Sequence, residues 1–178
     1  SAEGEIISAF SNRDWHDVPK ALSAAGTAAL GRTSGEVELI GRNGQLEEVI
    51  EISDRPIEKL AFSRNGLYLA AVTADGNCFI VNIDDTSILK SLGNIDATDI
   101  AVSTRGDYLL VAGGSGKNPK DRLNVSIHFI DGKVVPLIAP DDRFSPASEF
   151  RSLPITEPEI ALSPDGRTIA VSSAVSEI

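Results

Sequence analysis

The sequence predicts an all-β fold built from repeated units of four antiparallel strands. Four short segments resemble one another, and in each an apolar–polar alternation leads to a serine and then to a glycine. Three of the serines, Ser23, Ser63 and Ser103, are 40 residues apart, and Ser163 follows after 60. No stretch shows the sustained apolar period of about 3.6 residues that marks a helix. A repeat of constant length without helical periodicity favours a series of β-sheet units.

Each unit begins with a predicted hairpin that turns at a glycine. The four turns contain Gly26, Gly66, Gly106 and Gly166, and we expect these glycines to supply the positive φ of a tight turn. An apolar run follows each turn, at 27–30, 67–72, 107–112 and 168–171. A third, alternating strand is predicted at 36–40, 78–83 and 124–130, and a more polar fourth strand at 47–52 and 87–92.

A four-stranded unit every 40 residues has the period of a β-propeller blade, roughly 40–45 residues. We therefore predict that residues 1–178 form a partial β-propeller of about three and a half blades. The expected blades are 17–54, 55–94, 95–157 and an incomplete 158–178, with 5–10 as the outer strand of a neighbouring blade. Since propeller rings usually close with roughly 4–8 blades, we expect the remainder of the propeller, or a second chain, to complete the ring.

Two segments resemble the WD40 family of propeller repeats. The cue is the hairpin at 60–66 (LAFSRNG), followed by the turn at 74–76 (ADG), and it recurs at 160–166 (IALSPDG). The resemblance implies that Asp75 and the preceding Thr73 form a side-chain network within the blade, so both are expected to be structural, like the turn glycines. Val81 and Asn82 stand where the family has its Trp-Asp pair. The blades are also similar to those of the looser YVTN-type and TolB-type propellers, and these alternatives stay open.

The charge and the single cysteine limit the expected partners. The net charge is −10, from 26 acidic and 16 basic side chains, so we expect no nucleic-acid partner, because a phosphate backbone would be repelled. No apolar run approaches the roughly 20 residues that span a bilayer, so no direct membrane insertion of this segment is expected. Cys78 is the only cysteine, which weakly favours a reducing compartment and a cytoplasmic location.

No motif carries recognisable catalytic or cofactor chemistry. The stretch 113–117 (GGSGK) lacks the first glycine of a phosphate-binding P-loop and the Ser or Thr that follows its lysine. His16 and His128 have no Cys or Glu at metal-ligand spacing beside them. Cys78 lies within a predicted strand, where a buried and inert thiol is the default. We therefore expect no catalytic residue, no cofactor and no metal in this segment.

Two predicted loops carry the candidate partner contacts. The first interrupts the third unit and is basic on an acidic protein, so an acidic partner would be attracted to it. The second is a long excursion between 134 and 158 that carries apolar side chains, and long loops in compact domains are often functional. The candidate contact residues are Lys117, Lys120 and Arg122 in the first loop and Phe144, Phe150, Arg151 and Leu153 in the second.

These features predict a non-catalytic protein–protein interaction scaffold built on WD40-like propeller blades, with a protein or peptide as partner. The alternative is the propeller portion of a larger enzyme, of lactonase-like, quinoprotein-like or peptidase-gating type, with its active site outside this segment. Fold alone does not decide between them. A bound metal or cofactor on the complete protein would favour the enzyme, whereas a co-purifying protein would favour the scaffold.

Overall fold

The computed structural model describes residues 18–95, 97–113, 124–138, 155–163 and 165–175. Within these residues the chain consists of strands and turns, with no helix. The strands form three sheets of four strands and one sheet of two, and every strand pairs only with strands adjacent to it in sequence. Each sheet is therefore a simple antiparallel meander.

The strands have the following bounds. The first sheet contains β1 (Lys20–Leu22), β2 (Ala28–Gly31), β3 (Glu36–Ile40) and β4 (Leu46–Glu51). The second contains β5 (Ile57–Phe62), β6 (Tyr68–Thr73), β7 (Asn77–Asn82) and β8 (Ile88–Asn94). The third contains β9 (Asp99–Val102), β10 (Tyr108–Gly113), β11 (Asn124–Phe129) and β12 (Val134–Ile138). The last contains β13 (Ile155–Leu162) and β14 (Ile169–Val175).

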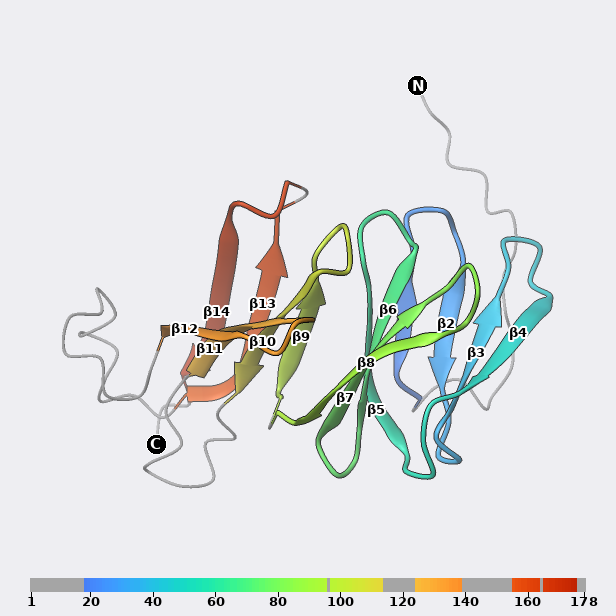
Figure 1. Ribbon diagram of the computed structural model, residues 1–178, viewed down its shortest axis with the longest axis horizontal. Coiled ribbons are helices and arrows are strands. Elements are labelled where there is room, and N and C mark those ends of the chain that lie inside the picture. The colour runs from blue at the N-terminus through green and yellow to red at the C-terminus, as the bar shows by residue number, and fades with distance from the viewer. Residues whose placement is uncertain (1–17, 96, 114–123, 139–154, 164, 176–178) are drawn as a thin grey trace.

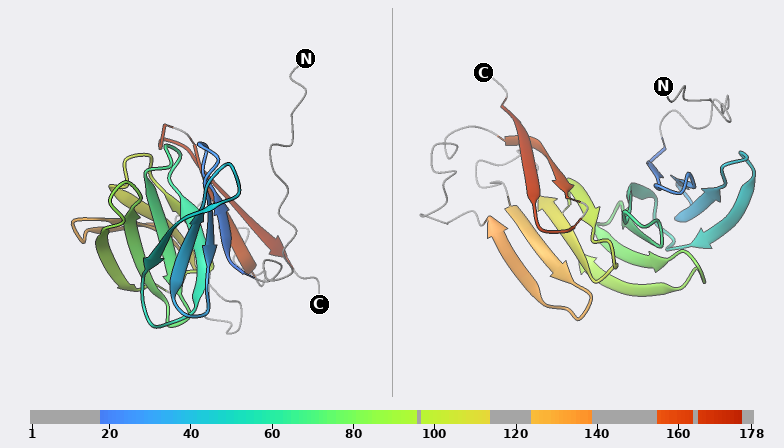
Figure 2. Two further views of the ribbon diagram at one scale, coloured as in Figure 1. Left: turned by 90° about the vertical axis from the view of Figure 1, so that its right-hand side faces the viewer. Right: turned by 90° about the horizontal axis from the view of Figure 1, so that it is seen from above.

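The four sheets follow one another round an open arc (Figures 1 and 2). The first strand of each sheet contacts the first strand of the next, so β1, β5, β9 and β13 lie along the inside of the arc. The later strands of each sheet fan outwards. This is the arrangement of β-propeller blades, and about three and a half blades are present. The predicted all-β fold class is confirmed.

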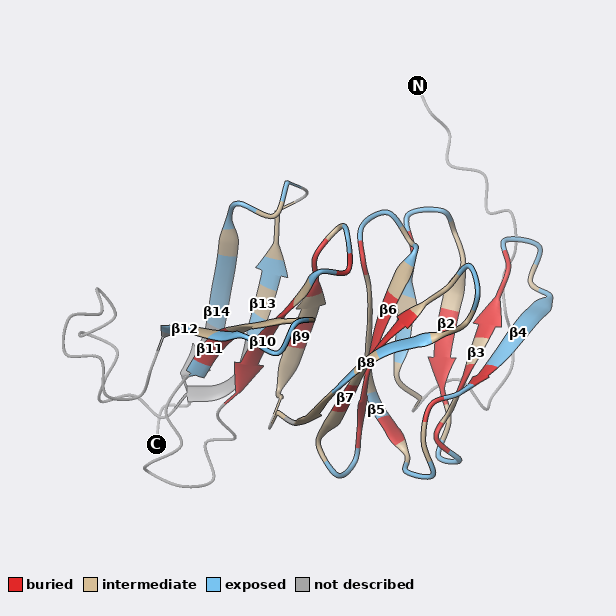
Figure 3. Cartoon of the chain, in the orientation of Figure 1, coloured by how far each residue is buried: buried red, intermediate tan, exposed pale blue. Residues whose placement is uncertain are grey.

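The core lies between successive sheets. Successive side chains of a strand point to opposite faces, so a strand in the middle of a sheet can pack against two neighbours. In β6, Leu69 and Ala71 join a cluster with the first sheet, while Ala70 and Val72 join a cluster with the third. The second strand of each full sheet is accordingly the most buried (Figure 3). Burial of one such Leu side chain contributes about 2 kcal/mol.

The first hairpin differs from the others in length. The Ser23 N–H donates to the carbonyl of Thr27, four residues on, whereas Ser63 and Ser103 donate to a carbonyl five residues on. The first turn is therefore one residue shorter, although its serine and glycine have the same spacing as in the other units.

At the other end of the chain, the strand β14 runs to Val175, beyond the predicted end at 171.

The proposed blade boundaries remain a prediction. The described sheets cover 20–51, 57–94, 99–138 and 155–175. The predicted outer strand at 5–10 lies outside the described residues.

Candidate functional site

The turns of the sheets form two opposite faces, because successive turns of a meander alternate between the two ends of its sheet. We define the upper face by one set of hairpin turns. These are β1–β2, β3–β4, β5–β6, β7–β8, β9–β10, β11–β12 and β13–β14. The lower face is formed by the turns β2–β3, β6–β7 and β10–β11 and by the connections between sheets. Figure 1 shows the turns β1–β2, β5–β6 and β13–β14 at the top.

The β6–β7 turn on the lower face is closed by a hydrogen-bond network. The Thr73 hydroxyl donates to Asp75 Oδ1 at 2.5 Å and is also 3.0 Å from the carbonyl oxygen of Asn77. The Asn77 amide donates to the other oxygen of the Asp75 carboxylate at 2.8 Å. The bond from Thr73 is the largest cause of a lowered pKa at Asp75. Thr73 and Asp75 therefore hold the turn in shape, and Thr73 is buried.

The repeated serines hold the hairpin turns of the upper face. The Ser163 hydroxyl donates to Asp165 Oδ1 at 2.6 Å and accepts the Thr168 N–H at 2.8 Å. Ser63 and Ser103 make the same pair of bonds to side chains and N–H groups in their own turns. Because each hydroxyl both donates and accepts a hydrogen bond within its own turn, it acts as a structural anchor. The repeat of serine was visible in the sequence, but this role was not among the predicted site residues.

Tyrosines of one sheet contact the turn glycine of the next. The Tyr108 hydroxyl donates to the carbonyl of Gly166 at 3.1 Å. The Tyr68 ring lies against Gly106, so closely that a Cβ there would be 2.5 Å from Tyr68 Cγ. Gly106 also has φ +70, in the region that favours glycine. The glycine is thus required both by its own turn and by the neighbouring blade.

Cys78 and Ser126 are buried within the sheets, and His128 beside Ser126 is half-buried. Burial raises the pKa of the Cys78 thiol to about 12, so it is not a reactive thiolate. Ser126 Oγ is 2.9 Å from His128 Nε2, and burial lowers the pKa of that histidine. Ser126 is itself buried. These two side chains therefore hydrogen-bond to each other within the sheet.

The described part of the chain contains no group of three or more His, Cys, Asp or Glu side chains placed to hold a metal ion. It likewise contains no helix of the length and apolar character needed to cross a membrane.

A groove of about 250 Å³ runs between the inner strands near the upper face. It spans three successive blades, and both apolar and polar side chains line it. Its lining residues are Ala61, Phe62 and Arg64 from the second sheet, Ile100, Ala101, Val102 and Thr104 from the third, and Leu162 and Ser163 from the fourth. No feature of the sequence had indicated this groove, because its walls come from three different repeats.

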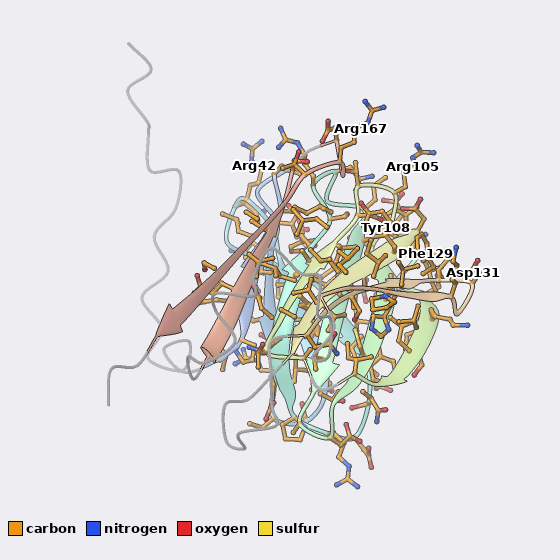
Figure 4. The ribbon with its side chains drawn as sticks, turned by 90° about the vertical axis from the view of Figure 1, so that its left-hand side faces the viewer. Arg42, Arg105, Tyr108, Phe129, Asp131 and Arg167 are labelled. Atoms are coloured by element: carbon orange, nitrogen blue, oxygen red, sulfur yellow. The ribbon has the colours of Figure 1, made fainter. Side chains whose placement is uncertain are left out.

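Exposed arginines surround this end of the molecule. Arg64 lines the groove, and Arg105 and Arg167 lie on the next two hairpin turns of the upper face. Figure 4 shows Arg105 and Arg167 at the same end of the molecule, together with Arg42 of the β3–β4 turn. These positions differ from the predicted contact residues.

The predicted contact residues fall in two segments outside the described residues. Lys117, Lys120 and Arg122 belong to 114–123, and Phe144, Phe150, Arg151 and Leu153 belong to 139–154. The described residues that flank the first segment, Gly113 and Asn124, are paired across β10 and β11. Ile138, which precedes the second segment, pairs with Val125 in the neighbouring strand. Both segments therefore start at the same lower end of the third sheet.

Comparison with known proteins supports the fold. No protein-family model matches the sequence, and no curated protein matches it. The β-propeller domain of Cps50 (Swd1) from Myceliophteria thermophila superposes with a TM-score of 0.64 at 15% identity, over 91% of this chain and 52% of that one. The C-terminal WD40 domain of Sif2 gives a TM-score of 0.59 at 16% identity, over 88% and 40%. The chain has the fold of part of a WD40-type β-propeller.

A third solved structure agrees. KlHsv2 with its loop 6CD replaced by a Gly-Ser linker gives a TM-score of 0.61 at 11% identity, over 86% of this chain and 48% of that one. The chain thus spans about half of the length of the structures that it resembles. The WD40-type resemblance of the repeats is confirmed at the level of fold.

Proposed function

We propose that this chain is a non-catalytic protein-interaction scaffold. The observation that carries the proposal is that the turns contain two kinds of side chain: some hold the turn in shape, and others face solvent. The recurring polar side chains, such as Ser63, Ser103 and Thr73, are bonded within their own turns, which leaves rigid turns that present other side chains to solvent. Such a surface can bind a protein or a peptide without dedicated chemistry, as the loops of rigid scaffolds often do.

The partner contacts are assigned in this proposal to the two predicted loops. Lys117, Lys120 and Arg122 would meet acidic side chains of the partner, and Phe144, Phe150, Arg151 and Leu153 would add apolar and cationic contacts. The supporting observation is that residues flanking both segments lie at the lower end of one sheet, the third. One partner could therefore contact both segments at once.

Closure of the ring is the second part of the proposal. Leu22 on β1 is 72% exposed, and Val171 on β14 is 37% exposed. Further blades, from the same polypeptide or from a second chain, would cover apolar side chains at these two positions. Light scattering on the purified protein tests this part: a larger parent chain or a stable assembly supports it, and a stable, folded 18.8 kDa monomer contradicts it.

Calorimetry with a defined partner tests the interaction function. A partner is first captured with the wild-type protein and then produced in pure form. We expect alanine at Lys117, Lys120 and Arg122 together, or at Phe144, Phe150 and Leu153 together, to weaken binding at least tenfold. A matched double substitution in the exposed β3–β4 turn, Arg42→Ala with Asn43→Ala, should leave the affinity unchanged. Equal affinity for all variants would contradict the assignment of these loops.

A further inference from the structure

We propose that the upper face carries a second binding site, for an acidic peptide segment of a partner protein that inserts an aliphatic side chain between the inner strands. The site is the groove between β5, β9 and β13, with the hairpin turns at its rim. It lies on the face opposite to the loops of the proposed function, so the two assignments stand independently. Three observations support it: the shape of the groove, the apolar side chains in its lining and the charges around it.

The shape suits a side chain. Two alanines, Ala61 and Ala101, occupy the same place in successive repeats and line the groove, so small residues leave the space open. The volume of about 250 Å³ is below the roughly 300–1,000 Å³ of typical small-molecule pockets. Phe62, Val102 and Leu162 supply apolar surface to the lining. The groove therefore fits one or two aliphatic side chains better than a cofactor.

The charges around the groove favour carboxylates. The hairpin turns of the last three sheets carry three arginines, Arg64, Arg105 and Arg167, and none of them forms an ion pair with a carboxylate of the described residues. The carboxylates in the same turns, Asp107 and Asp165, each accept a serine hydroxyl at 2.6 Å. These three turns thus carry three positive and two negative side chains, an excess of one positive charge on a protein of net charge −10.

Negative charge is placed further out on the same face. The β7–β8 turn carries Asp84 and Asp85, whereas in the β11–β12 turn Lys133 balances the charge of Asp131. An acidic segment is therefore attracted towards the inner turns and repelled from the β7–β8 turn. In an extended peptide, alternate side chains point to opposite sides. An aliphatic side chain can then enter the groove while flanking carboxylates reach the arginines.

The same observations argue against other anionic ligands. A nucleic acid or an anionic membrane presents a dense negative charge that the net charge of −10 repels. A nucleic acid also has no aliphatic side chain to place against the apolar residues of the lining. A short peptide carries few charges and can be accommodated locally.

Fluorescence anisotropy with defined peptides tests the site. The probes are fluorescein-labelled eight-residue peptides with one central Leu and two Asp or Glu on either side. Control probes replace the acids with Asn and Gln, or replace the Leu with Ala. We expect the acidic Leu peptides to bind the purified protein at least tenfold more tightly than either control. Binding should weaken as the salt concentration rises, because exposed charges are screened.

A pair of variants locates the binding. Arg64→Glu reverses an exposed charge at the edge of the groove. It should weaken the binding of the acidic peptides at least tenfold. The matched control is Arg55→Glu on the lower face, where an exposed arginine lies beside Asp54, and it should leave binding unchanged. Circular dichroism checks that both variants are folded. Equal loss in both, or no loss in Arg64→Glu, overturns the site.

Two further arms separate the classes of ligand. A single-stranded oligonucleotide and phosphatidylserine vesicles are titrated under the same conditions. Tighter binding of either one, lost in Arg64→Glu, overturns the peptide assignment. Absence of binding by every acidic peptide also overturns it. Since the lower-face loops are unchanged in all of these variants, neither result bears on the proposed function.

Discussion

At the scale of single residues, the side chains that recur are the ones that shape turns. Thr73 illustrates this, because its buried hydroxyl joins two strands of a hairpin through Asp75 and Asn77. The resemblance of the sequence to WD40 repeats implied a network at this position. Its third member, Asn77, was not predicted, because the side chain could equally have pointed into solvent.

Thr73→Val removes the hydroxyl but keeps the shape of the side chain. We expect it to lower the free energy of unfolding by about 1–2 kcal/mol, because polar partners of the hydroxyl lose a hydrogen bond. Urea denaturation measures the change. The control is Thr33→Val in the exposed β2–β3 turn, which should change stability by less than about 0.5 kcal/mol. An unchanged Thr73→Val protein would show that the network does not support the turn.

His128 gives a pH dependence with a defined sign. Burial lowers its pKa in the folded protein below the ordinary 6.5, so the unfolded chain binds the proton more readily. The stability that comes from neutral His128 is present above pH 6.5 and is lost as the pH falls towards the lower folded pKa. We expect urea titrations at pH 7.5 and 5 to show a smaller loss of stability in His128→Gln than in the wild type. Equal losses would contradict burial of the neutral ring.

At the scale of elements, the junction between blades depends on glycine. Gly106 has positive φ, and the Tyr68 ring of the preceding sheet occupies the space of its missing Cβ. The hairpins themselves could be predicted, because strand alternation and turn glycines are local signals. The contact between Tyr68 and Gly106 could not, because it joins residues of different repeats.

Gly106→Ala tests this junction. We expect a loss of about 2–4 kcal/mol, from the strained φ and from displacement of the Tyr68 ring. The matched control is Gly132→Ala, since Gly132 also has positive φ but has nothing within 4 Å of the Cβ position. That change should cost roughly 1–2 kcal/mol, from φ alone. Equal losses in thermal or urea unfolding would mean that the contact between blades contributes nothing.

Three further features of the strands and turns were not predicted, because local sequence patterns do not reveal them. The period of 40 residues located three sheets, but the shorter first turn was hidden, because Ser23 and Gly26 keep the common spacing. The strand β14 was predicted too short because Ser172 and Ser173 interrupt its apolar run, although the strand continues through them. Pairing with β13 overrides the local polarity. The groove and its arginine rim were likewise invisible before the sheets were placed side by side.

At the scale of the whole molecule, each sheet packs on the sheets next to it, and the blades follow one another round an open arc. Its apolar clusters lie between the sheets. The fold is therefore a support whose turns present side chains to solvent on both faces. The central claim is that the lower face uses this support to bind a protein.

Hydrogen–deuterium exchange on the complex with the captured and purified partner tests that claim most directly. The account predicts slower exchange in 114–123 and 139–154 on binding, with unchanged exchange in the outer strand β4. Alanine at Lys117, Lys120 and Arg122 should abolish the slowing in both segments. If the partner slows exchange elsewhere and leaves both segments as they are in the free protein, the lower-face loops are not the binding surface and the central claim is wrong.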